Sequence, residues 1–419
     1  MKTCMKRIGI AALFMVLFSG IINVYAQDNE NYFTISGVVR DKANRKKLEY
    51  VNISVPGSNL SSITNEEGAF VLKIKDSIQA KEIEFSIIGY FSASIPINGI
   101  DLLDQTFYLN RNEKQLKEIV IESWKYPVDL VREALERVAS NYSSKPNLFT
   151  GFYRETVQKR KKFINISEAV INIYKSPYTK DIEADRVQVF KGRSLVTTKA
   201  SDTLVVKLLG GPNLSIYADI VKNPEILFDE ESLNYFNFKM ENSEFLDNRQ
   251  QYVVSFKPMV ILPYPLCFGT LYIDKETLAF TRAEFYMDMK DRNKATDAIL
   301  RKKPSGLRFK PEEVLFVVSY KQRDGKSYLN YIRNEVKFNC DWKRRLFATN
   351  YVVLSEMVVT ENQEETVSNI PRKESFNRNE SLSDKVMNFY DDNFWGTYNI
   401  IEPTESLESA VSKLKKEYR

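Results

Sequence analysis

The sequence predicts a mainly β protein in two parts, a small β-sandwich followed by an α+β domain. The chain has 23 Tyr and 26 Phe but only 15 Gly among 419 residues, and aromatic-rich, glycine-poor sequence favours strands. Residues 33–110 consist of short alternating runs broken by turn residues, which is the pattern of a sandwich. Helical periodicity enters only after residue 126, where it precedes and follows a long series of strand-like segments.

Residues 1–26 have the pattern of a secretory signal peptide. Three basic residues precede an apolar run over 8–22, and Val24-Tyr25-Ala26 fits a small-x-small cleavage site. We therefore expect export and a mature chain that begins near Gln27. A membrane anchor is the alternative, but a span needs about 20 apolar residues, and neither this run nor any later one is long enough.

Composition narrows the range of functions. The chain contains no histidine, which excludes Ser-His-Asp and Cys-His catalysis and His-ligated zinc. After the signal segment, 57 basic and 55 acidic residues remain, a net charge of +2, so charge gives no reason to expect nucleic acid as a partner. We expect no cofactor, no metal and no catalytic residues.

Cys267 and Cys340 are the only cysteines after the signal segment. In an oxidising compartment such a pair permits one disulfide. Two separately buried thiols are the alternative, and the sequence does not choose between them.

Each strand of the sandwich follows from local alternation. Candidate strands lie at 35–39, 50–55, 70–74, 83–88 and 106–109, and charged or Pro/Gly-containing turns separate them. Asn65-Glu66-Glu67-Gly68 predicts a hairpin turn in which Gly68 has a positive φ.

An ordered set of motifs runs through these strands: Gly37-Val38-Val39-x-Asp41, Leu48-x-x-Val51-x-Ile53, Gly57, Thr64-Asn65-Glu66-Glu67-Gly68-Ala69-Phe70 and Phe85-Ser86-Ile87-Ile88-Gly89-Tyr90. This pattern resembles the carboxypeptidase regulatory-like domain of Gram-negative envelope proteins. The resemblance implies a transthyretin-like sandwich of about seven strands and a periplasmic or outer-membrane-associated location. It implies no peptidase activity, because a zinc carboxypeptidase site needs histidine.

Residues 111–126 are expected to link the two domains. Within them, Leu116–Glu122 is strand-like and resembles the segment that follows this domain in TonB-dependent nutrient receptors. A linker strand that pairs with a neighbouring sheet is the simpler interpretation. An accessory subunit of a nutrient-uptake system is the alternative.

Residues 127–419 are predicted to form the α+β domain. Helices are expected at 127–142 and at 405–419, where Leu407, Val411 and Leu414 share a face. In the strand 279–289, Ala283 and Phe285 share one side, which predicts a sheet with one buried face. Further strands are expected at 163–174, 186–190, 251–256, 270–273, 314–320, 327–338 and 347–360, with a loop at 304–308 and an exposed polar excursion at 360–382.

Parts of this domain also resemble known proteins. Asn141-Tyr142, Gly151-Phe152-Tyr153-Arg154-Glu155, Glu168-Ala169 and Asp392-x-Phe394-Trp395-Gly396-x-Tyr398-Asn399 resemble an uncharacterised Gram-negative envelope family, from which no activity follows. Leu271-Tyr272-Ile273-Asp274-x-x-Thr277 is similar to a hairpin of lipoprotein-carrier proteins. That likeness implies a curved antiparallel sheet with flanking helices and an apolar cavity.

Few residue groups stand out as candidate sites. Arg154-Glu155 suits a ligand or an ion pair at a strand end. Asp229-Glu230-Glu231 and Asp391-Asp392 offer carboxylates to calcium but lack EF-hand spacing, which favours solvated charge. Tyr264 lies between two prolines in a rigid apolar loop, which suits a pocket cover, the core or a sheet edge.

The sequence therefore favours a non-catalytic exported envelope protein that binds a protein partner or an apolar small ligand. A secreted carboxylate-dependent glycan hydrolase is the alternative that needs no histidine, and it requires two acids facing each other across a cleft. No pattern in the sequence indicates an oligomeric state.

Overall fold

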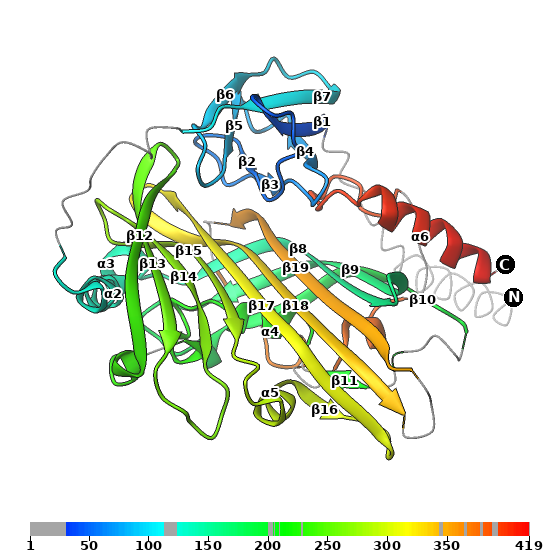
Figure 1. Ribbon diagram of the computed structural model, residues 1–419. Helices are drawn as coiled ribbons and strands as arrows, with labels where there is room; N and C mark the ends of the chain where they lie inside the picture. The colour runs from blue at the N-terminus through cyan, green and yellow to red at the C-terminus, as the bar shows by residue number, and fades with distance from the viewer. Residues whose placement is uncertain are drawn as a thin grey trace, which may run out of the picture.

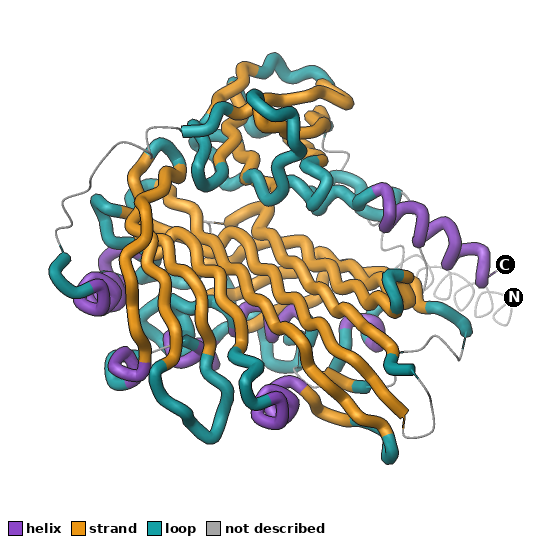
Figure 2. Tube along the Cα trace, viewed as in Figure 1, coloured by secondary structure: helices purple, strands orange, loops and turns teal. Residues whose placement is uncertain are grey.

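The computed structural model describes residues 31–112, 124–199, 204, 206–208, 210–227, 229–342, 347–363, 367–377, 380–387 and 393–418. The signal segment and Leu116–Glu122 lie outside these ranges. As predicted, the protein is mainly β, with a seven-stranded sandwich and a larger, curved antiparallel sheet (Figure 1). Most helices lie against the larger sheet (Figure 2).

The sandwich consists of two sheets with the strand orders β4-β1-β7 and β3-β2-β5-β6. Phe70, Leu72 and Ile74 of β4 are buried between them. Gly68 has a φ of +70°, as predicted, and a β-carbon there would lie 2.8 Å from the carbonyl oxygen of Val39. The strands are β1 (Tyr32–Asp41), β2 (Asn52–Ser54), β3 (Ser61–Ile63), β4 (Ala69–Lys75), β5 (Glu82–Ser86), β6 (Ala93–Pro96) and β7 (Leu102–Leu109).

The second domain is organised around a ten-stranded antiparallel sheet with the order β10-β9-β8-β19-β18-β17-β15-β14-β13-β12. β19 pairs with both β8 and β18, so the last strand in the sequence joins the two halves of the sheet. The strands are β8 (Asn147–Lys159), β9 (Lys162–Lys175), β10 (Arg186–Val196), β12 (Phe236–Leu246), β13 (Arg249–Pro258), β14 (Cys267–Asp274), β15 (Phe280–Met287), β17 (Leu307–Arg323), β18 (Lys326–Trp342) and β19 (Thr349–Gln363). β11 (Lys207–Leu208) and β16 (Leu300–Lys302) form a separate short ladder.

Each strand that the sequence predicts within the described residues is confirmed, and β3, β6, β8, β11, β12 and β16 are additional. The centre of β8, from Phe149 to Val157, is buried without alternation. Helices cover one of its faces, and the sandwich with residues 394–401 covers the other, so no exposed side marks the period. The predicted loop at 304–308 ends at Gly306, and β17 begins at the next residue.

Helices cover one face of the large sheet. α2 (Pro127–Glu136) and α3 (Val138–Asn141) replace the single helix expected over 127–142, with a break at Arg137. α2 buries Leu130, Val131 and Ala134. α4 (Pro212–Tyr217) and α5 (Arg292–Ile299) pack on the same face. No helix within the described residues is long and apolar enough to cross a membrane.

The terminal helix is confirmed as α6 (Glu405–Lys415). Leu407, Val411 and Leu414 are buried, as predicted. They pack against Ile166 of β9 and Leu195 of β10, at the outermost strands of the sheet.

The sandwich sits on the face of the large sheet opposite α2 to α5, and α6 packs on the same face as the sandwich. Ile63 of β3 packs in an apolar cluster with Tyr331 of β18. Arg333 of the same strand donates to the hydroxyl of Tyr50 and lies 2.9 Å from Glu66. Tyr50 has a φ of 58°, which is uncommon for an aromatic residue, and this backbone places its ring 5.7 Å from that of Tyr331.

Asn399 closes the edge of the sandwich at β4. Its Oδ1 accepts the amide of Lys73 at 2.7 Å, and its Nδ2 donates to the carbonyl of Lys73 at 3.0 Å. Unpaired edges invite pairing with other chains. The Asn399 side chain therefore takes the place of one residue of an additional strand.

The segment 360–382 is less exposed than predicted. β19 continues to Gln363, and Ile370, Phe376 and Leu382 are buried. Phe376 and Leu382 belong to the core between the sheet and the helices. Polar residues outnumber these three buried apolar residues in the segment 360–382, so its composition alone predicts exposure.

Candidate functional site

The two cysteines are free and buried in different places. Cys267 of β14 packs in the core between the sheet and the helices, whereas Cys340 of β18 packs in the cluster around α5. The structure thus has separate thiols and not the disulfide that the sequence also permits. Burial raises the pKa of the Cys267 thiol to about 12 and that of Cys340 to about 11, so neither is poised as a thiolate.

Arg154 and Glu155 belong to separate networks. As neighbours on β8 they point to opposite faces of the sheet. Arg154 lies 2.8 Å from Glu168 and donates to the carbonyl of Ile401 at 2.7 Å, on the sandwich side. Glu155 accepts from the hydroxyl of Tyr153 at 3.0 Å on the helix side, and burial raises its pKa. The structure does not bring this pair together as one site.

The other sequence candidates are also dispersed. Asp229 accepts the amide of Ser232 at 2.9 Å, and its hydrogen bonds with Ser232 lower its pKa. Within the described ranges, no group of three His, Cys, Asp or Glu side chains could hold a metal ion. Asp391 and Asp392 lie outside those ranges. Tyr264 is 56% exposed and is therefore not a core residue.

A buried polar cluster lies behind the helix layer. The ammonium of Lys175 lies 2.8 Å from Asp185 Oδ2 and 2.7 Å from Asp219 Oδ2, and all three side chains are fully buried. Tyr320 and Tyr178 donate their hydroxyls to Asp219, at 2.7 and 3.2 Å. Desolvation alone would lower the pKa of Lys175, but the two carboxylates outweigh it and raise the pKa. The cluster is therefore a buried ion pair with hydrogen-bonded support.

Lys222 lies beside this cluster, and its side chain is also buried. Its ammonium donates to Ser176 Oγ at 2.9 Å and to the carbonyl oxygens of Pro177 and Lys180. Desolvation lowers the pKa of Lys222 to about 8, although Asp185 lies 3.9 Å away. The side chain thus fastens the loop after β9 to the segment after α4.

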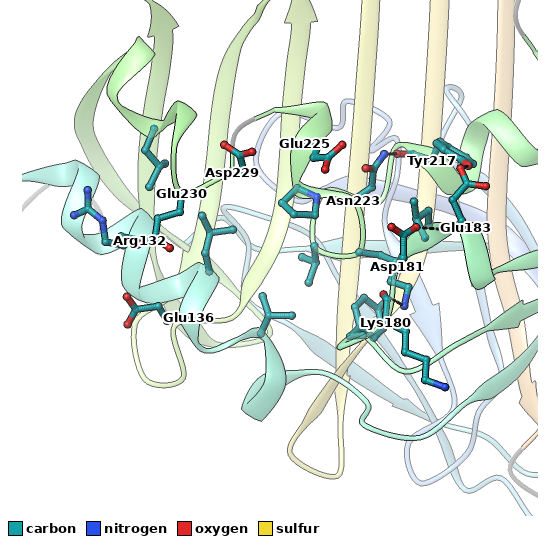
Figure 3. A pocket seen from close by; sticks show the side chains of 18 residues that line it. Arg132, Glu136, Lys180, Asp181, Glu183, Tyr217, Asn223, Glu225, Asp229 and Glu230 are labelled. Carbon is teal, nitrogen blue, oxygen red and sulfur yellow. Dashed lines mark hydrogen bonds between the residues drawn. The ribbon is translucent and has the colours of Figure 1, made fainter.

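That loop forms one wall of a pocket of about 600 Å³ (Figure 3). α2 and the start of α3 form the second wall, and the third runs from the end of α4 through Pro224–Ile226 to residue 233. The volume is in the range of small-molecule sites. The apolar part of the lining consists of Leu135, Val138, Tyr178, Ile182, Tyr217, Val221, Pro224 and Leu233.

The pocket is acidic on a chain whose formal net charge is +5. Its three basic residues are Arg132, Lys180 and Lys222. Arg132 already pairs with Asp129 at 2.8 Å, and Lys222 faces the carbonyl oxygens of the loop. The acidic residues of the lining, which Figure 3 shows around the opening, are Glu136, Asp181, Glu183, Glu225, Asp229 and Glu230.

Sequence reasoning finds only the periphery of this site. It singles out Asp229 and Glu230 and predicts the helix that becomes α2, but not the lysines of the cluster. A signal for Lys175 exists: Ile171 and Ile173 precede it at a spacing of two, so alternation places all three on the buried face. A lysine on a buried strand face indicates a paired charge.

Several solved structures resemble the chain at low identity. A domain described as an outer membrane lipoprotein-sorting protein from Vibrio parahaemolyticus is 11% identical over 58% of this chain and 94% of its own, with a TM-score of 0.27. A LolA superfamily protein from Nitrosomonas europaea is 11% identical over 59% and 97%, with a TM-score of 0.19. A membrane-associated protein of unknown function from Bacteroides fragilis is 11% identical over 79% and 98%, with a TM-score of 0.16.

The sequence comparisons concern the sandwich alone. No curated protein matches the chain. Residues 35–121 match the family model described as the CarboxypepD_reg-like domain, which confirms the resemblance that the turns of the sandwich predict.

Proposed function

We propose that this protein is a non-catalytic, exported envelope protein that binds an amphiphile in the pocket between α2 and the segment after α4. The ligand would combine an apolar body with a positively charged group. The observation that carries the proposal is the pairing of an apolar interior, including Leu135 and Val138, with a rim of six carboxylates. The apolar ligand that the sequence suggests is thereby narrowed to a cationic amphiphile.

The charges of the lining support a cation rather than an anion. Arg132 and Lys222 are engaged within the protein, by Asp129 and by backbone carbonyls. Asp229 has a lowered pKa and is ionised at neutral pH. An amine at the rim would meet carboxylates, whereas a phosphate or carboxylate there would be repelled.

The same residues argue against catalysis. A general acid near neutral pH needs a raised pKa, and the pKa of Asp229 is lowered. The amine of Lys222 is hydrogen-bonded to two carbonyl oxygens and to Ser176, so it does not offer a free lone pair as a nucleophile or base. A glycan hydrolase has no supporting observation at this pocket.

The two domains would divide the work. The sandwich sits on the opposite face of the large sheet, so it leaves the pocket open (Figure 1). We assign it the part of an interaction or spacer module. The export signal and the regulatory-like sandwich together support a periplasmic or outer-membrane-associated location.

Calorimetric titration with two detergents of equal chain length and opposite charge tests the proposal. Below their micellar concentrations, dodecyltrimethylammonium should bind and dodecyl sulfate should not. Asp181→Asn combined with Glu225→Gln should weaken binding of the cation about two- to thirtyfold, since each exposed ion pair contributes about 0.2–1 kcal/mol. Glu276→Gln with Asp324→Asn, two exposed acids elsewhere, serves as the matched control. Equal binding of both detergents, or no effect of the pocket variant, would contradict the proposal.

A further inference from the structure

One end of the large sheet exposes a cluster of apolar side chains. The loop 259–266 joins β13 to β14 at the lower margin of Figure 1. Ile261 is 91% exposed and Met259 is 62% exposed, and Tyr264 also faces solvent. Adjacent exposed side chains of this kind mark an interaction surface.

Backbone contacts fix the direction in which this loop points. The sandwich meets the turn between β12 and β13, where the amide of Gly89 donates to Phe245 at 2.9 Å and that of Ser92 to Asn248 at 3.1 Å. From that turn β13 runs through its ten residues to the loop, a distance of roughly 30 Å. The apolar loop therefore lies at the end of the sheet remote from the sandwich.

Basic residues lie on one side of the loop, whereas the segment on its other side, whose Tyr235 carbonyl accepts the amide of Met259, carries the acidic residues Asp229, Glu230 and Glu231. The amide of Asp288 donates to the carbonyl of Leu266 at 2.8 Å, so the chain that leads into α5 lies against the base of the loop. From residue 290 to residue 310 this chain has eight basic and two acidic residues. Exposed basic residues of this chain and of the end of β13 include Lys257, Lys290, Arg292, Arg301, Lys302 and Lys303.

A second basic tip lies at the same end. Arg160 and Lys161 form the turn between β8 and β9, and the amide of Arg160 donates to Asn350 at the start of β19. Both have positive φ, 48° and 66°, in a turn type that ordinarily takes Asn-Gly. Arg160 and Lys161 therefore adopt an unfavourable backbone conformation, and their long side chains add positive charge to this end of the sheet. Along the sheet β8 is five strands from β14, roughly 24 Å, so the basic surface is broad.

We propose that this end of the sheet docks on a bilayer that contains anionic phospholipid. The apolar loop would enter the headgroup region, and the lysines and arginines on its α5 side would contact the lipid phosphates. A projecting apolar tip with neighbouring cations is the arrangement of interfacial membrane binding. Lysine is depleted at protein–protein interfaces, whereas it is attracted to anionic lipid surfaces, so the lysine-rich chain beside the loop favours a membrane over a protein partner.

Vesicle co-sedimentation of the exported chain tests the proposal, with vesicles of equal parts phosphatidylglycerol and phosphatidylcholine against vesicles of phosphatidylcholine alone. We expect binding to the anionic vesicles that falls as salt is raised. Ile261→Asp should lower the partition coefficient about tenfold or more, because an apolar anchor becomes a charge. The double variant Lys302→Glu with Lys303→Glu should weaken binding to the anionic vesicles more at low salt than at high salt.

Exposed residues of the sandwich provide matched controls. Ile100→Asp and the pair Lys42→Glu with Lys46→Glu make the same changes at the opposite end and should leave partitioning unchanged. The altered loop residue is solvent-exposed, so the thermal melt of Ile261→Asp should match that of the parent. Absence of binding to anionic vesicles, equal binding to neutral ones, or equal loss in the control variants would overturn the proposal. Cross-linking of the loop to a protein in place of lipid would also overturn it.

Discussion

Replacing Lys175 with methionine should destabilise the second domain strongly. The side chain is completely buried, and its ammonium lies 2.8 and 2.7 Å from Asp185 and Asp219. Methionine fills a similar volume but removes this cation from the two buried carboxylates, and the ammonium of Lys222 lies 3.9 Å from Asp185. Removing one partner of a buried ion pair is destabilising by about 3–5 kcal/mol. That is a large part of the total stability of a typical domain, about 5–15 kcal/mol.

Equilibrium urea unfolding, followed by tyrosine fluorescence and far-UV circular dichroism, measures this change. Lys239→Met removes an exposed lysine that lies 3.0 Å from Glu241, and it should alter stability by less than about 1 kcal/mol. Adding Asp219→Asn to Lys175→Met should recover part of the loss, because it removes one of the two unpaired charges. If Lys175→Met were no more destabilising than Lys239→Met, the buried ion pair would not exist as described.

Three further predictions concern the sandwich and its joint. Burial opposes ionisation of Asp41, but the groups that donate hydrogen bonds to its carboxylate outweigh burial and lower its pKa. The contribution of Asp41 to stability is therefore present above about pH 3.9 and is lost as the pH falls towards the lowered pKa. Asp41→Asn should make the stability of the protein depend less on pH in that range. Gly37→Ala should lower stability by about 1–3 kcal/mol in thermal melts, because its β-carbon would lie 2.0 Å from the carbonyl oxygen of Gln105. Asn399→Ala removes both hydrogen bonds to Lys73 and should lower the free energy of opening the joint between the domains by about 1–3 kcal/mol. Limited proteolysis should therefore cleave this joint faster in the variant.

Five of the seven strands of the sandwich could be predicted because their signals are local, whereas the short strands β3 and β6 lie outside the expected ranges. Turn residues such as Gly68 punctuate short alternating strands, and each signal lies within a few residues of the structure it specifies. Strands of the large sheet with one covered face, such as β15, follow the same logic. β8 could not be predicted in this way, because both of its faces are covered and its sequence therefore has no polar side.

The pocket could not be predicted because its walls come from distant parts of the chain. Leu135 and Ile182 line it from separate segments, and residues 217–233 complete it. Only the β9–β10 connection and the covering of the sheet by α2 bring them together. No rule of sequence spacing relates such segments. Likewise, Asp185 and Asp219 can be recognised as ion-pair partners only when the structure places Lys175 between them.

The most direct test of the account is to locate the bound ligand on the protein. A photoreactive alkylammonium, with its diazirine on the alkyl chain, would be cross-linked to the purified chain and the labelled peptides identified by mass spectrometry. The account predicts labels on the walls of the pocket, within 132–138, 178–183 and 217–233, and competition by unlabelled dodecyltrimethylammonium. Labels confined to the loop 259–266, or spread over the surface without competition, would contradict the assignment of the pocket as the binding site.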